Sequence, residues 1–170
     1  MLSYKLLFFL PLISTIFTYP FGMLLGEKTA QYFSSTLISI AAILSWFLFI
    51  SFSSSSSSEI IIPVLEWFFI SGQFFNWGIS VNSLTLLMLT LVLTVSALVH
   101  IYSIDYMSHD NSKIRFMTYL SLFTFCMVAL VVSDNLIQLF FGWEGVGLAS
   151  YLLIGFWHHK KSANLAAMKA

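Results

Sequence analysis

Five long apolar segments, separated by short polar stretches, decide what this chain can fold into. Each is close to the roughly 20 residues that an α-helix needs to cross about 30 Å of hydrocarbon. Only 8% of the residues are charged, whereas soluble domains carry about 25%. The sequence therefore predicts an all-α polytopic membrane protein of about five transmembrane helices, with lipid around its outer surface. The expected spans are 6–25, 30–52, 84–104, 116–132 and 135–157.

The connection between the second and third spans, about residues 53–81, differs in composition from the rest. It opens with the low-complexity run Ser53–Ser58, which predicts a flexible connector. Aromatic and turn residues then mix from Trp67 to Asn82, a pattern typical of a short β-hairpin. We expect this hairpin on the extracytoplasmic side of the membrane.

Basic residues predict the orientation of the chain in the membrane. Lys28 follows the first span, Lys113 and Arg115 lie between the third and fourth, and Lys160 and Lys161 follow the fifth. The other two connections carry no Lys or Arg. Because positively charged loops stay on the inner side, we expect the N-terminus outside and the C-terminus in the cytoplasm or the mitochondrial matrix.

One acidic residue, Glu144, falls inside an otherwise uncharged span. Counted from Asp134 at about 1.5 Å per residue, it lies roughly 15 Å deep, near the bilayer midplane. A carboxylate at that depth is costly and typically marks an ion or proton path. A Lys or Arg on a neighbouring helix would favour its ionised form, but the five spans supply none. We therefore expect the partner cation elsewhere; the alternative is a protonated carboxyl that only hydrogen-bonds across a helix interface.

Two further residues are candidates for proton transfer. Asp134 precedes the fifth span together with Asn135, and we expect this pair to act mainly as a helix cap. Gln138, one turn further in, would extend a polar path from the outer face. His100 is either a proton shuttle or a hydrogen-bonded residue near the membrane surface. Interhelical hydrogen bonds are expected for three residues of the fourth span, Thr118, Ser121 and Thr124.

The sequence contains no residue pattern that predicts a cofactor or metal site. The single cysteine, Cys126, cannot form an internal disulfide, and no Cys/His spacing predicts a metal site. The net charge is zero without a basic face, which argues against a nucleic-acid partner. We expect this chain itself to bind no cofactor and no metal.

Three stretches together resemble the N-terminal third of subunit 5 of respiratory NADH:ubiquinone oxidoreductase (complex I), an antiporter-like family. They are residues 98–107, 115–125 and 133–154, and the part from Phe141 to Tyr151 is the most specific. The resemblance implies a proton-translocating subunit of the membrane arm, in which Glu144 pairs with a lysine on the seventh helix. It also implies that FMN, iron–sulfur clusters, NADH and ubiquinone are handled by other subunits of the complex.

The family continues for many more helices, whereas this chain stops at Ala170. We therefore expect a split subunit whose remaining helices and partner lysine come from a second polypeptide; a fragment or a truncated product is the alternative. The bias towards Phe, Ile and Ser favours the mitochondrial inner membrane over a bacterial plasma membrane, with the N-terminus in the intermembrane space. The competing functions are the large subunit of a cation/proton antiporter and a structural or assembly subunit without pumping.

Overall fold

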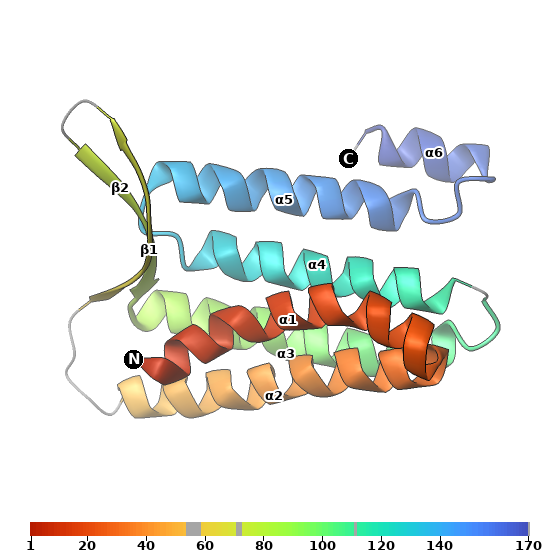
Figure 1. Cartoon of the computed structure of the whole chain (residues 1–170), viewed down its shortest axis with the longest axis horizontal. Helices are drawn as coiled ribbons and strands as arrows, with labels where there is room; N and C mark the ends of the chain where they lie inside the picture. The colour runs from red at the N-terminus through yellow and green to blue at the C-terminus, as the bar shows by residue number, and fades with distance from the viewer. Residues whose placement is uncertain (54–58, 71–72, 111, 170) are drawn as a thin grey trace.

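The computed structural model describes residues 1–53, 59–70, 73–110 and 112–169, and it shows long helices lying side by side with a small sheet at one end (Figure 1). The five longest helices, of 19 to 27 residues, are long and apolar enough to cross a membrane. This confirms the predicted polytopic all-α architecture. The described elements are α1 (Leu2–Leu25), α2 (Glu27–Ser53), β1 (Ile60–Ile70), β2 (Gln73–Val81), α3 (Ser83–Tyr106), α4 (Lys113–Val131), α5 (Leu136–Ile154) and α6 (Lys161–Ala167).

The predicted hairpin between α2 and α3 is present. Strands β1 and β2 pair antiparallel, with Ile60 opposite Val81, and two irregularities shift the register along the ladder. The predicted serine-rich connector falls mostly outside the described residues: Ser53 ends α2, and residues 54–58 are not described. The backbone N–H of Ser80 donates to the carbonyl of Val132 (2.9 Å), so the base of the hairpin is fastened to the turn between α4 and α5.

Helices α1 to α4 pack around one apolar core. Large side chains from each of them are almost completely buried there, for example Leu7, Ile38, Leu86 and Val128. The turn between α1 and α2 is tight, and Gly26 makes it with a φ of 101°, a conformation that a side chain would disfavour. Helix α5 lies on the far side of α4 and packs mainly against that helix (Figure 1).

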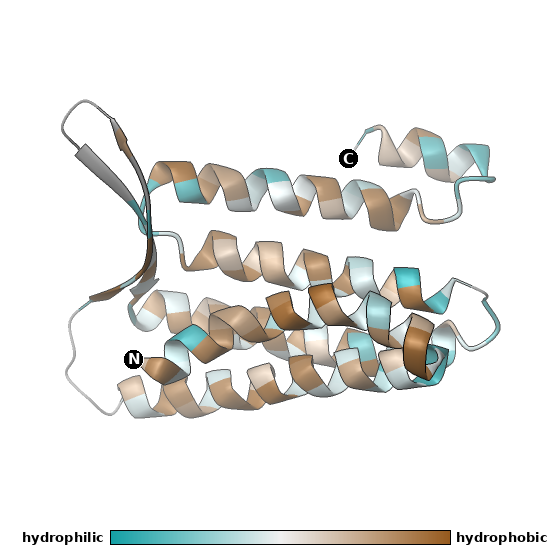
Figure 2. Cartoon of the chain, in the orientation of Figure 1, coloured by the Kyte–Doolittle hydropathy of each residue, from teal (hydrophilic) through white to brown (hydrophobic). Residues whose placement is uncertain are grey.

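Apolar residues cover the outer faces of the long helices (Figure 2). Large side chains such as Ile43 and Phe47 on α2 and Leu98 on α3 are mostly exposed. Helix α5 carries the same kind of surface, including Leu136 and Trp143. A surface of this composition is suited to lipid or to further helices rather than to water.

The two ends of the bundle differ in charge. One end, which we call the basic end, carries Lys28, Lys113 and Arg115 and the start of α6 with Lys160 and Lys161 (Figure 1). There Lys113 Nζ lies 3.1 Å from Glu27 Oε2 and links α4 to α2. The opposite end carries the β-hairpin and is called the hairpin end. The fold thus gathers the basic loops at one end, in agreement with the alternation of charge along the sequence.

Candidate functional site

Glu144 lies one residue before the midpoint of α5, a helix of 19 residues and therefore about 28 Å long. Its side chain is exposed. Among the described residues it has no ion pair and no hydrogen bond. About one turn further on, a Cβ added at Gly147 would meet no other atom within 4 Å. Glu144 and Gly147 thus belong to a face of α5 that the described residues leave uncovered.

Small residues on the opposite face of α5 set this orientation. A Cβ added at Gly142 would lie 2.7 Å from backbone atoms of Leu130, and one at Gly145 would lie 2.7 Å from Cys126 Sγ. Ala149 is fully buried. The close approach of α4 therefore fixes the rotation of α5. Since each residue turns a helix by about 100°, Glu144 points about 200° away from Gly142.

His100 lies in the core of the α1–α4 bundle, six residues before the end of α3, and is completely buried. Its Nδ1 is 2.8 Å from the carbonyl oxygen of Ser96, and its Nε2 is 3.3 Å from Ser121 Oγ. A carbonyl can only accept, so Nδ1 carries the proton of a neutral imidazole and Nε2 accepts from the serine hydroxyl. Both ring nitrogens are then satisfied inside the core.

Ser121 extends this contact to the two remaining helices. Its Oγ lies 2.9 Å from Ser14 Oγ on α1 and 2.8 Å from Ser34 Oγ on α2. Ser14 Oγ also lies 3.2 Å from Ser34 Oγ. The four side chains Ser14, Ser34, His100 and Ser121, one from each helix, form what we call the core polar cluster. A single serine in an apolar helix gives no strong sequence signal for such a cluster, so Ser14 and Ser34 were not predicted as members.

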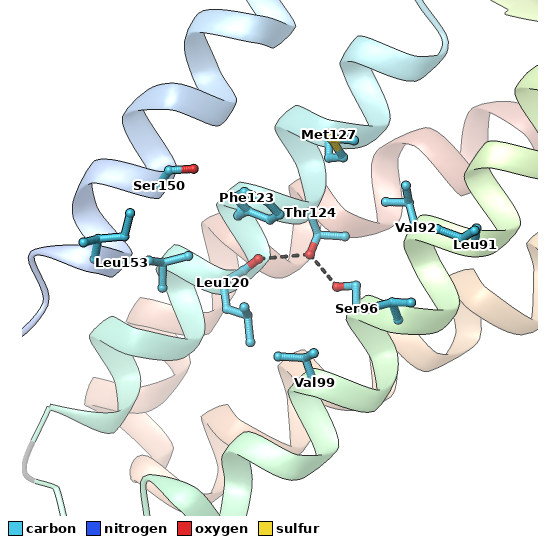
Figure 3. Close-up of a pocket in the computed structure, with 12 residues that line it drawn as sticks. Leu91, Val92, Ser96, Val99, Leu120, Phe123, Thr124, Met127, Ser150 and Leu153 are labelled. Atoms are coloured by element: carbon cyan, nitrogen blue, oxygen red, sulfur yellow. Dashed lines mark hydrogen bonds between the residues drawn. The ribbon is translucent and has the colours of Figure 1, made fainter. Parts of the chain in front are cut away.

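The predicted interhelical hydrogen bonds of α4 are found for two of the three residues. Ser121 belongs to the core polar cluster, and Thr124 Oγ1 lies 2.5 Å from Ser96 Oγ on α3. Figure 3 shows this second contact at the wall of an apolar pocket between α3, α4 and α5. Thr118 instead donates to the carbonyl of Ile114 in its own helix (2.9 Å).

Asp134 is exposed in the turn before α5, and the cap of that helix is its neighbour Asn135, whose side chain accepts from the backbone N–H of Gln138 (2.9 Å). The Gln138 amide is committed to the hairpin and does not extend a polar path. Its Nε2 donates to the carbonyl of Gly78 (2.9 Å), and the N–H of Gly78 donates to its Oε1 (3.2 Å). Sequence reasoning missed this two-bond contact because it joins residues 60 positions apart.

The three predicted site residues lie in separate places. Glu144 is on the uncovered face of α5, His100 is in the α1–α4 core, and Asp134 is at the hairpin end. Within the described part of the chain, no group of three or more His, Cys, Asp and Glu side chains could hold a metal ion. Of these three residues, Glu144 is the one that lies mid-helix on an exposed face, where a further helix can pack against it.

Two family models match this chain. Residues 67–117 match the N-terminus of chain 5 of NADH-ubiquinone oxidoreductase (complex I), and residues 133–170 match the transmembrane region of the NADH:quinone oxidoreductase/Mrp antiporter family.

Curated relatives match along nearly the whole chain. It is 47% identical over 161 residues to NADH-quinone oxidoreductase subunit L of Rickettsia conorii. The matched region covers 95% of this chain and 24% of that protein. It is 46% identical over 169 residues to NADH-ubiquinone oxidoreductase chain 5 of Arabidopsis thaliana, covering 98% and 25% respectively. The chain spans about a quarter of the length of these relatives.

A solved structure of the Mrp complex from Dietzia sp. DQ12-45-1b shares the fold, with a TM-score of 0.66 and 22% identity over 90% of this chain and 15% of that one. The fold and the matched models define a multi-pass membrane subunit of the antiporter-like class. Within that class, the chain belongs to the family of NADH:ubiquinone oxidoreductase (complex I) chain 5, whose N-terminal part it matches. The resemblance predicted from the sequence is confirmed.

Proposed function

We propose that this chain forms the N-terminal part of a proton-translocating subunit in the membrane arm of NADH:ubiquinone oxidoreductase. The position of Glu144 carries the proposal. In the five spanning helices, every other Asp, Glu, Lys or Arg lies within about one turn of a helix end. An acid retained at mid-membrane is expensive, and such residues mark ion and proton pathways.

The role proposed for Glu144 is to take up and release a proton. A cation that approaches the carboxyl favours the ionised form and expels the proton, and its withdrawal favours reprotonation. This chain places the acid on an uncovered face and leaves space beside it at Gly147. The cation is the lysine that the resemblance implies on the seventh helix of the family, in the part of the subunit that lies beyond the matched residues. Asp134 and His100 have no contact with Glu144 and stand as weaker candidates for the same path.

The remaining steps of the reaction belong to other subunits. We infer that NADH oxidation, ubiquinone reduction, FMN and the iron–sulfur clusters are located there, and that this chain couples to them through its membrane-arm neighbours. We also propose the mitochondrial inner membrane as its location, in line with the bias towards Phe, Ile and Ser. The basic end would face the matrix, because the basic loops gather at that end.

The test is Glu144→Gln, which keeps the size of the side chain and removes its ionisation. In the assembled complex in sealed vesicles, we expect a fall in protons translocated per NADH oxidised. The matched control is Glu66→Gln, which removes an exposed carboxylate in β1 and should leave that ratio unchanged. Subunit composition on native gels verifies that both variants assemble.

Two outcomes would favour the competing functions. Normal assembly with an unchanged ratio in Glu144→Gln would leave a structural or assembly role. Sodium-dependent proton exchange by a complex that lacks flavin and iron–sulfur subunits would identify a cation/proton antiporter.

A further inference from the structure

A second pocket, of about 550 Å³, lies at the basic end between α4, α5 and α6. Several of its lining residues carry polar groups at the ends of their side chains, and no Asp or Glu is among them. A pocket lined by a guanidinium, phenol hydroxyls, an imidazole and an amide offers donors to a ligand rather than negative charge. The polar lining residues are Arg115, Tyr119, Tyr151, His158 and Asn164.

Arg115 is the centre of positive charge in this pocket. Its Nε is buried and has no hydrogen-bond partner among the described residues. The guanidinium carbon lies 4.9 Å from the centre of the Phe156 ring, which limits how the planar group can turn. An unpaired buried donor is costly, and a guanidinium fork fits the oxygens of a phosphate or carboxylate.

Asp110, the acid in the loop before α4, already accepts two hydrogen bonds. Asp110 Oδ1 accepts from the backbone N–H of Ser112 (2.7 Å), and its Oδ2 accepts from Trp157 Nε1 (3.1 Å). It forms no ion pair with Arg115 within the described residues. On the other side, Lys160 Nζ lies 5.2 Å from the centre of the Trp157 ring. Asp110 keeps its charge and acts on Arg115 at longer range, but the two positive charges of Arg115 and Lys160 outnumber it.

Aromatic residues place this pocket at the level of the lipid headgroups. Tyr102 stacks on Tyr106 (5.8 Å between ring centres), and Tyr106 lies 6.5 Å from Trp157. Tyr and Trp gather where hydrocarbon meets the headgroup layer. An anion that is abundant at this depth is the phosphate of a phospholipid.

We propose that the pocket between α4, α5 and α6 binds the phosphate of an anionic phospholipid headgroup, with Arg115 as its principal ligand. The guanidinium pairs with phosphate oxygens, and the tyrosine, histidine and asparagine side chains offer further donors. The bound lipid would tie α6 to the spanning helices at the basic end. This site is independent of Glu144 and of proton transfer.

The test uses the assembled complex, purified in detergent and depleted of lipid. Hydrogen–deuterium exchange of residues 155–169 is followed during titration with phosphatidylglycerol, with phosphatidylcholine or with inorganic phosphate. We expect phosphatidylglycerol to protect this segment at the lowest concentration. Since one basic residue near an anionic lipid contributes about 1 kcal/mol, Arg115→Gln should raise the midpoint about fivefold.

Two variants keep the test decisive. Lys28→Gln removes an exposed charge from the same end, outside this pocket, and should leave the midpoint unchanged. Arg115→Lys keeps the charge, which favours assembly, and should give a midpoint between those of the wild type and Arg115→Gln.

Three results would overturn the proposal. One is an equal midpoint in the wild type and both Arg115 variants. Another is protection by inorganic phosphate as effective as that by phosphatidylglycerol, which would assign the site to a free anion. The third is a structure of the complex with a protein carboxylate on the Arg115 guanidinium.

Discussion

His100 and Ser121 meet in the middle of the membrane bundle, with the imidazole Nε2 3.3 Å from the serine Oγ. Through this serine the contact reaches Ser14 on α1 and Ser34 on α2. Polar groups in such a core are tolerated when their hydrogen bonds are made, and both nitrogens of this imidazole have partners. The core polar cluster therefore joins four helices at one point.

Removing the hydroxyl of Ser121 should loosen all four helices. Interhelical hydrogen bonds in membranes average about 0.6 kcal/mol each, and Ser121→Ala removes three, so we expect a loss of about 1–2 kcal/mol. Reversible unfolding of the chain in mixed micelles measures it. The matched control is Ser39→Ala, because Ser39 donates only within α2, to Ser35 (2.7 Å). Equal losses in the two variants would contradict a linking role for the cluster.

An added methyl group should destabilise the protein at one glycine of α5 and not at another. At Gly142 the methyl group would lie 2.7 Å from the backbone of Leu130, which cannot move aside, whereas at Gly147 it meets open space. Overpacking typically costs about 1–3 kcal/mol, so Gly142→Ala should destabilise the α4–α5 contact and Gly147→Ala should not. Unfolding of the reconstituted chain measures both. A neutral Gly142→Ala variant would show that the two helices do not depend on this approach.

The Gln138 amide should hold the β-hairpin against α5. Gln138→Leu leaves the N–H and carbonyl of Gly78 without their side-chain partners, and a buried unpaired group costs about 1–3 kcal/mol. We expect faster proteolysis within β1 and β2, measured by limited digestion in vesicles. Ser133→Ala is the control, since that hydroxyl bonds only to Leu130 in the preceding turn (2.8 Å). Unchanged digestion in Gln138→Leu would rule out this clamp.

Acid should release the contact between Asp110 and Trp157. The backbone N–H of Ser112, and then the Trp157 indole, hold the pKa of Asp110 below its ordinary value of 3.8. Because the folded-state pKa is the lower one, the contribution to stability is complete above about pH 3.8 and is lost as the pH falls through the folded-state pKa.

The measurement is the fluorescence of Trp157 as the pH is lowered, taken as the difference between the wild type and Asp110→Asn. This difference isolates Asp110 from the other acids of the chain, and it removes the signal of the remaining tryptophans. An identical acid response in the two proteins would mean that Asp110 does not hold the indole.

The spanning helices and the hairpin could be predicted from local properties of the sequence. A run of apolar residues of membrane length forms a helix whatever its neighbours are, because its backbone must satisfy its own hydrogen bonds in lipid. The same argument identified Glu144 as unusual, since the cost of a charge depends on its depth. The family resemblance rested on contiguous motifs such as Phe141–Tyr151, which need no tertiary contact to be recognised.

The direction in which each side chain points was decided only by packing. His100 was expected to be either a proton shuttle or a hydrogen-bonded residue near the membrane surface, and only the crossing of four helices shows that it is enclosed among them. Gln138 was expected to line a path, but the return of the hairpin engages its amide with Gly78. Glu144 faces away from α4 because Gly142 lets that helix approach from the opposite side. The sequence of one helix determines how much free energy it costs to place each polar or charged side chain in the membrane. Contacts between distant segments determine which neighbouring groups offset that cost.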